Sequence, residues 1–258
     1  MAKDVIQSIA LALVAFATAV AMGQSAASEN PGFNPKDYPE AEFQVTQSTH
    51  MFEGIKIRIV QARRRKTNAT PPSYCRAWVY VSGGAENLRS LYYGDIDPVG
   101  GGYGIFVPAE QPSSEYFVMV KEGDYDGHLL LFDKQGQVTD LLGGFFFLAS
   151  DGRFLVSQYS SDESGLSVFD FQRHRPLLQS KDIPYIENWY KDDLGYFFTE
   201  AEWTGASGYP HEKPGVGYRL DLKEGQVVPT SVTASELKSA VRVKYDFDPR
   251  QSRDCMTK

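Results

Sequence analysis

The sequence predicts an all-β fold built from repeated groups of four short strands. The chain is mostly short runs of aromatic and β-branched residues separated by turn residues, and helical periodicity is scarce. A pattern of apolar strand, Asp, polar turn and apolar strand also repeats. It occurs in "HLLLFDKQGQVTDL" (128–141), again in "GLSVFDFQRHRPLL" (165–178), and more faintly in "GYRLDLKEGQVVP" (217–229).

The β runs fall in order into four groups, each about 40 to 50 residues long. The first two groups take 43–48, 55–61, 76–82 and 88–93, then 103–107, 116–121, 128–132 and 138–142. The last two take 145–149, 154–159, 166–169 and 176–178, then 185–190, 196–203, 216–222 and 227–231. One helix is expected at 234–243, with Thr233 or Ser235 as its N-cap.

The third group resembles a known repeat. "FFFLASDGRFLVSQYSSDESGLSVFDFQRHRPLL" (145–178) is similar to one blade of the broad β-propeller class that includes the WD40-like and TolB-like repeats, with Asp151-Gly152 as a turn and Phe169-Asp170 as a strand end. The resemblance implies a β-propeller-like fold of about four blades, in which neighbouring sheets bury each other's apolar faces. The Gly-His and Trp-Asp signature of WD40 repeats is absent, so the resemblance implies a fold and no activity. A β-sandwich or irregular barrel is the alternative.

The N-terminus predicts export. An apolar, Ala-rich run from Val5 to Gly23 precedes the small-residue stretch Ser25-Ala26-Ala27-Ser28, which fits a signal-peptide cleavage site. We therefore expect a signal peptide at 1–27, an extended leader at 28–41, and a single domain with a C-terminal tail at 42–258, in the periplasm or secreted. An uncleaved membrane anchor is the alternative. No later segment is apolar for long enough to span a membrane.

Export changes the interpretation of the two cysteines. Cys75 and Cys255 are the only pair, and an even count in an oxidising compartment indicates a disulfide. Closing so long a loop contributes on the order of 5 kcal/mol in the chain-entropy model, less any strain. Two unpaired thiols are the alternative.

The net charge and the absence of known catalytic motifs reduce the number of function classes that fit the sequence. With 26 basic and 33 acidic residues, the net charge is −7, which argues against nucleic acid as a partner. The sequence has no G-x-S-x-G elbow, H-E-x-x-H helix, Walker loop or paired C-x-x-C. We therefore expect no cofactor and no metal.

Binding groups concentrate on variable loops carried by a rigid scaffold, and in a propeller the longer loops here would open on one face. An Arg run suits an acidic surface or a phosphate-like group, and exposed aromatic residues suit a sugar ring or a protein partner. The candidate ligand-binding residues are Arg63, Arg64, Arg65, Asp95, Asp97, Asp124, Asp126, Trp203, Tyr209 and His211.

Two functions follow from these residues. The first is a non-enzymatic binding domain that recognises a protein, or a glycan, through the long loops. The second is a carbohydrate-active hydrolase or lyase, because paired carboxylates can protonate a leaving oxygen and activate water. Whether the chain is an enzyme stays open, and the binding domain is the interpretation we favour.

Overall fold

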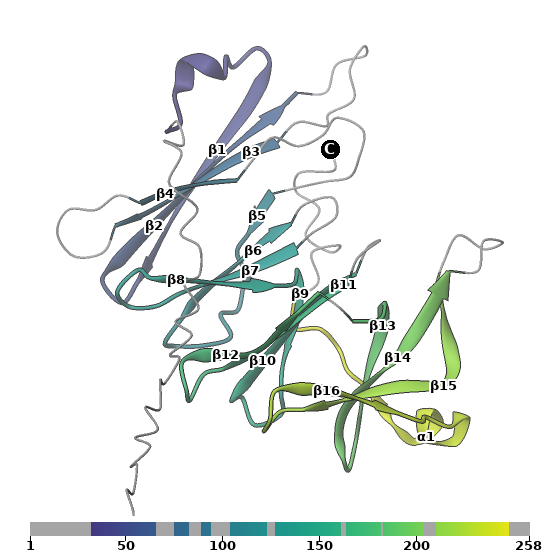
Figure 1. Cartoon of the computed structure of the whole chain (residues 1–258). Helices are drawn as coiled ribbons and strands as arrows, with labels where there is room; N and C mark the ends of the chain where they lie inside the picture. Colours follow the sequence, from purple (N-terminus) through teal and green to yellow (C-terminus); the bar gives the residue numbers. More distant parts are fainter. Residues whose placement is uncertain are drawn as a thin grey trace, which may run out of the picture. The chain divides into compact units, whose positions relative to one another are not determined.

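The computed structural model forms four antiparallel sheets and one short α-helix (Figure 1). The residues that it describes are 32–65, 75–82, 89–93, 104–122, 127–160, 164–181, 183–203 and 210–247. All of them fall within one compact unit, Pro31–Lys258. The predicted signal peptide (1–27) and its cleavage site lie outside the described residues.

The first sheet contains the four segments of the first predicted group. Its strands pair in chain order: β1 (Phe43–Phe52), β2 (Ile55–Arg64), β3 (Cys75–Ser82) and β4 (Arg89–Tyr93). Glu53 and Gly54 form the turn between β1 and β2, with φ angles of 46° and 89°. Positive φ at both positions gives a turn whose twist matches that of the strands. The two strands accordingly stay in one register from Phe43 opposite Arg64 to Phe52 opposite Ile55.

Each remaining sheet also matches one predicted group. The second contains β5 (Gly104–Phe106), β6 (Phe117–Glu122), β7 (Gly127–Phe132) and β8 (Val138–Leu142). The third contains β9 (Phe145–Leu148), β10 (Phe154–Ser160), β11 (Ser164–Asp170) and β12 (Arg175–Ser180). The fourth contains β13 (Ile186–Asp192), β14 (Gly195–Trp203), β15 (Pro210–Asp221), β16 (Gln226–Thr230) and the added β17 (Val241–Arg242). Every predicted strand is therefore confirmed, with some ends displaced.

The Asp that recurs in the sequence closes the hairpin between the third and fourth strands of a sheet. In the second sheet, the Asp133 carboxylate accepts the backbone N–H groups of Gln135 at 2.9 Å and Gln137 at 2.8 Å. The same kind of bond links Asp170 to Gln172 and Arg173, and Asp221 to Lys223 and Glu224. Such bonds stabilise a tight turn by satisfying its backbone donors. The repeated Asp is therefore a structural residue.

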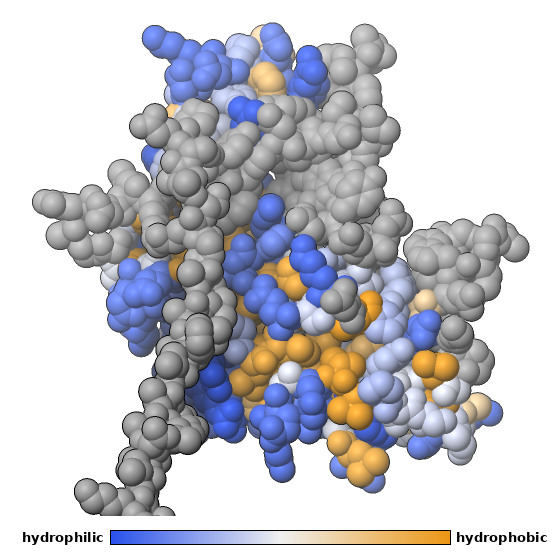
Figure 2. Space-filling view, in the orientation of Figure 1, coloured by the Kyte–Doolittle hydropathy of each residue, from blue (hydrophilic) through white to orange (hydrophobic). Residues whose placement is uncertain are grey.

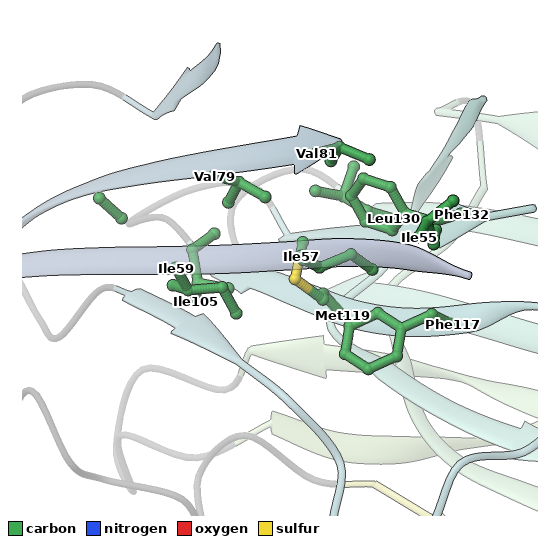
Figure 3. Packing of buried hydrophobic residues seen from close by; sticks show 11 residues of the cluster. Ile55, Ile57, Ile59, Val79, Val81, Ile105, Phe117, Met119, Leu130 and Phe132 are labelled. Atoms are coloured by element: carbon green, nitrogen blue, oxygen red, sulfur yellow. The ribbon is translucent and has the colours of Figure 1, made fainter. Parts of the chain in front are cut away.

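Successive sheets share apolar cores. Ile57 and Val79 of the first sheet pack with Met119 and Leu130 of the second (Figure 3). A second cluster joins the second and third sheets, and a third cluster, which contains Trp189, joins the third and fourth. The all-β fold of four antiparallel sheets is thus confirmed, and each sheet buries an apolar face against the next.

The outer faces of the first and fourth sheets are covered differently. Phe33 and Tyr38, the latter next to the short 3₁₀ helix η1 (Pro35–Asp37), pack on Trp78 of β3 with ring centroids 5.0 and 5.2 Å away. Val232, which is 2% exposed, lies against Gly217 of β15. No core cluster of the described residues joins the fourth sheet to the first. The closed ring of a propeller is therefore not seen in this part of the chain, because other segments occupy the faces that closure would use.

The predicted helix is shorter than expected. α1 (Ala234–Ser239) begins with a capping box between Thr233 and Glu236 and ends at Ser239, before the C-cap residue Ala240, whose backbone is extended. The prediction of a helix to residue 243 is wrong because β17 pairs with the edge of β13 instead. Phe247 then stacks on Phe146 of β9, at a centroid distance of 5.7 Å. Within the ranges described, no helix has the length and apolarity that crossing a membrane requires.

Candidate functional site

Half of the ten predicted ligand-binding residues lie outside the described residues. This holds for the five predicted ligand-binding residues Asp95, Asp97, Asp124, Asp126 and Tyr209. It holds for the predicted disulfide as well, because Cys255 is outside the description, whereas Cys75 is the first residue of β3. These predictions remain predictions.

Trp203 and His211 lie on neighbouring strands. Trp203 ends β14 opposite Pro210, and His211 follows in β15 opposite Glu202. His211 was expected in the loop between the strands predicted at 196–203 and 216–222, and this was wrong, because β15 begins at Pro210. The β14–β15 ladder has an irregularity between Thr199 and Ala201, and such irregular stretches tolerate prolines. The side chains of Trp203 and His211 are outside the description.

The Arg run is described, and two of its members lie on a strand instead of in the predicted loop. Arg63 and Arg64 are the last residues of β2, opposite Gln44 and Phe43 of β1. Arg65 is exposed, and its Nε donates to the carbonyl oxygens of Glu40 at 2.8 Å and Phe43 at 3.3 Å. Arg65 therefore fixes the leader to the start of β1, while Arg64 remains exposed.

The hairpin that ends in this run is strongly basic. We define the basic hairpin as residues 43–65, which comprise β1, its turn, β2 and Arg65. It holds five basic residues, Lys56, Arg58, Arg63, Arg64 and Arg65, and one acidic residue, Glu53, for a net charge of +4 in a chain whose net charge is −7. The remaining residues therefore carry a net charge of −11. Such an asymmetry concentrates positive charge in one part of an acidic chain.

Three of these basic residues share one face of the sheet. Lys56, Arg58 and Arg64 alternate along β2 with residues of the other face, since successive side chains of a strand point to opposite sides. Lys56 is exposed opposite Met51, which is itself 70% exposed. The Arg58 guanidinium lies 4.4 Å from the centre of the Tyr80 ring. This stacking holds the Arg58 cation on the face in a fixed orientation.

Sequence reasoning missed Lys56 and Arg58. The signal was present in "IKIRI" (55–59), where apolar and basic residues alternate strictly. A strand with this pattern places its cations on one face, opposite its buried isoleucines. The Arg run alone suggested a basic loop, whereas the alternation indicates a basic sheet face.

The enzymatic alternative gains no support from the described residues. A carboxylic general acid needs a raised pKa. Instead, hydrogen bonds from Arg153 and from Arg219 lower the pKa of Asp170 and of Asp192, and the Thr233 backbone N–H lowers the pKa of Glu236. Each of these carboxylates is thus held ionised by a structural partner. The part of the chain that is described also contains no group of three metal-ligating side chains.

Tyr116 and His174 form a polar pair outside the basic hairpin. The Tyr116 hydroxyl lies 3.0 Å from His174 Nδ1. Burial raises the pKa of Tyr116, and the nearby carboxylates of Asp133 and Glu115 raise it further. Tyr116 therefore stays protonated and serves as a hydrogen-bonding group that links the second and third sheets.

Apolar side chains gather over β10, β12 and β16 in Figure 2. Leu177 and Leu178 of β12 and Val227 of β16 are partly buried and pack against the third core cluster. Val228, on the same strand as Val227, is 43% exposed. This apolar surface is thus the partly exposed edge of a core. The charges of the basic hairpin, by contrast, do not belong to an apolar core.

Comparisons with known proteins add little. Neither known protein families nor curated proteins give a match to this chain. Among solved structures, the chain is similar to a proposed 6-phosphogluconolactonase from Bacteroides uniformis, with 9% sequence identity and a TM-score of 0.30, over 76% of this chain and 73% of that one. At this score the likeness carries no argument about fold or activity.

Proposed function

We propose that the chain is an exported, non-enzymatic binding domain whose basic hairpin recognises an acidic protein. The charge asymmetry carries the proposal: the basic hairpin has a net charge of +4 within a chain of −7. Lys56 and Arg58 lie at one end and Arg64 at the other end of the same face of β2, with the buried Val60 and Ala62 between them. The N-terminal apolar run and small-residue stretch support export to the periplasm or the outside.

The scaffold supports this role. We propose that the four sheets form a propeller-like stack that holds β2 rigid from its buried face, where Ile55, Ile57 and Ile59 are each at most 2% exposed. A cation on a rigid strand loses little conformational freedom on binding, so its attraction to an anionic partner is retained as affinity. Charge of this kind also accelerates the encounter with a partner of opposite sign.

The test is capture of partners from the native cell envelope by two charge-reversed variants. The first carries Lys56→Glu, Arg58→Glu and Arg64→Glu in the basic hairpin. The second is a matched control with Lys223→Glu, Lys238→Glu and Lys244→Glu, three residues that are exposed and lie elsewhere. Both variants have the same net charge, so only the position of the charge differs.

We expect the wild type and the control to retain a protein that the hairpin variant loses by about tenfold or more, since several charge pairs of roughly 0.5 to 1 kcal/mol are lost and replaced by repulsion. The captured amount, measured by quantitative mass spectrometry, should also fall with increasing salt. Equal capture by all three proteins, after circular dichroism has shown that each is folded, would contradict the proposed function.

A further inference from the structure

The edge strands β5, β8 and β9 have outer backbone groups that other residues occupy. In the second sheet, Ile105 of β5 donates its N–H to Gln61 Oε1 at 3.1 Å and accepts from Gln61 Nε2 at 3.2 Å. Past the end of β5, the Gln111 side chain bonds the N–H and C=O of Val118 in the same way, at 2.7 and 3.3 Å. Side-chain amides thus complete the ladder where no strand continues it.

The edges of β8 and β9 are occupied as well. Leu142 of β8 donates its N–H to Ser167 Oγ at 2.9 Å and accepts from Ser157 Oγ at 2.7 Å. On β9, Phe146 forms a β-bridge with Phe247, and Leu148 donates its N–H to Asp246 Oδ2 at 2.6 Å.

Other edges are protected by their composition or length. β12 and β16 each contain a proline, at 176 and 229, and β17 is two residues long. Proline, short length and covering groups are the devices by which native sheets prevent pairing with another chain.

β1 has none of these devices. Its sequence, "FQVTQSTHMF", contains no proline and no Asp, Glu, Lys or Arg, and its register with β2 has no bulge. It is ten residues long, and residues 46–49 are all exposed. Among the described residues, no strand or side chain bonds the side of residues 44–52 that faces away from β2. β1 is therefore a long edge with open hydrogen-bonding groups.

We infer that an extended acidic segment of the partner adds to the first sheet as a strand beside β1. This inference rests on the proposed function and names the form in which the acidic partner binds. Every second residue of an edge strand turns its N–H and C=O outward, so residues 44–52 present about four or five such residues. Backbone bonds supply affinity in this mode of recognition, and alternate side chains supply specificity.

Charge determines the occupant. A second copy of the chain would bring another hairpin of net charge +4 against the first. An acidic strand would lie about 10 Å from β2, two strand spacings away, and long cationic side chains cover much of that distance. Lys56 lies directly behind Met51 of β1 and attracts glutamate side chains on the added strand. Arg58 lies behind Thr49, but its guanidinium is held over Tyr80 of β3, so it adds only to the positive potential of the hairpin.

The test uses two synthetic peptides and the full chain. The first is a ten-residue peptide that alternates glutamate with valine or threonine. The second has the same length and the same number of glutamates, with proline in place of each valine and threonine. Both have equal charge, and the glutamate amides of the second are also N-methylated, so the proline peptide has no N–H with which to donate a ladder of hydrogen bonds. Binding is measured by fluorescence anisotropy and by amide hydrogen exchange of residues 44–52.

We expect the first peptide to bind at least tenfold more tightly than the proline peptide and to slow exchange at alternate residues of β1. The double variant Lys56→Glu, Arg58→Glu should bind the first peptide more weakly than the wild type does. Equal binding of the two peptides that still depends on Lys56 and Arg58 would overturn strand addition and leave the proposed function standing. Strand addition would also be overturned if neither peptide binds, or if sedimentation shows that the chain dimerises through β1. The capture experiment would then still decide the proposed function separately.

Discussion

Replacing Gly143 by alanine is expected to destabilise the protein by roughly 3 to 5 kcal/mol, the sum of a backbone strain and an overpacking cost. Gly143 links β8 to β9 and has a φ of +131°, a conformation that residues with a side chain rarely adopt. A Cβ at this position would lie 2.5 Å from the backbone nitrogen of Gln158 and 2.7 Å from the carbonyl carbon of Ser157. Because both obstacles are backbone atoms in the third sheet, no side-chain rotation relieves the clash.

The matched control is Gly152→Ala. Gly152 also has a positive φ, +68°, but nothing lies within 4 Å of the position of its added Cβ. Gly152→Ala therefore lowers the free energy of unfolding only through the strained backbone conformation, by about 1 kcal/mol. Thermal unfolding should lower Tm by roughly 10 °C or more for Gly143→Ala and by about 3 °C for Gly152→Ala. Similar shifts for both variants would show that the second and third sheets are not joined as closely as the structure places them.

Removal of the Asp170 carboxylate is expected to cost about 3 kcal/mol. Asp170 is fully buried, and it accepts two hydrogen bonds from Arg153, at 3.0 Å to Nε and 2.6 Å to Nη2. An Asp170→Ala variant leaves the guanidinium and two turn N–H groups without their acceptor. Breaking a buried pair costs about 3 to 5 kcal/mol, and the lower end applies because the Arg153 side chain is 34% exposed and can reach water.

Asp133→Ala is the control, because Asp133 occupies the same hairpin position in the second sheet. There the carboxylate accepts only from the Gln135 and Gln137 backbone. Its removal should cost about 1 kcal/mol, comparable to the loss of a helix cap. Chemical denaturation of the two variants measures the difference, and equal costs would contradict the role assigned to Arg153.

Asp170 also predicts a pH dependence. The Arg153 hydrogen bonds lower the pKa of Asp170 in the folded state, with smaller contributions from the Arg173 and Gln172 N–H groups, and burial opposes the shift. The stabilisation is therefore complete above the unfolded pKa of about 3.9 and is lost as the pH falls through the lower folded pKa. Asp170→Asn keeps a turn acceptor but removes the charge, so its stability should fall less than that of the wild type on acidification below about pH 4.

The sequence was sufficient for the strands because their signals are local. Alternating apolar residues mark the strands, and the recurring Asp at 133, 170 and 221 marks one hairpin in each of the last three sheets, without reference to distant residues. Ring closure was not predictable in this way. It depends on which segment covers the outer face of the first sheet, and that face is taken by Phe33 and Tyr38, whose sequence context predicts only an extended leader.

Short elements that depend on tertiary contacts were missed for the same reason. Val241 and Arg242 continue a helical pattern, yet they form β17 because the edge of β13 offers hydrogen bonds. The candidate site was predictable in part. The Arg run was identified, but the open edge of β1 becomes evident only by contrast with β5, β6 and β8, where Gln61, Gln111 and Ser167 bond the outer backbone groups.

Backbone amide exchange of the free chain, followed residue by residue by NMR, tests the central claim most directly. The account predicts alternation along residues 44–52: amides that face β2 exchange slowly, and amides that face away exchange quickly. Leu142 provides the internal reference, because its edge N–H bonds Ser167 Oγ and should be protected. Uniform protection along β1, equal to that of Leu142, would mean that another group already occupies this edge and would contradict the account.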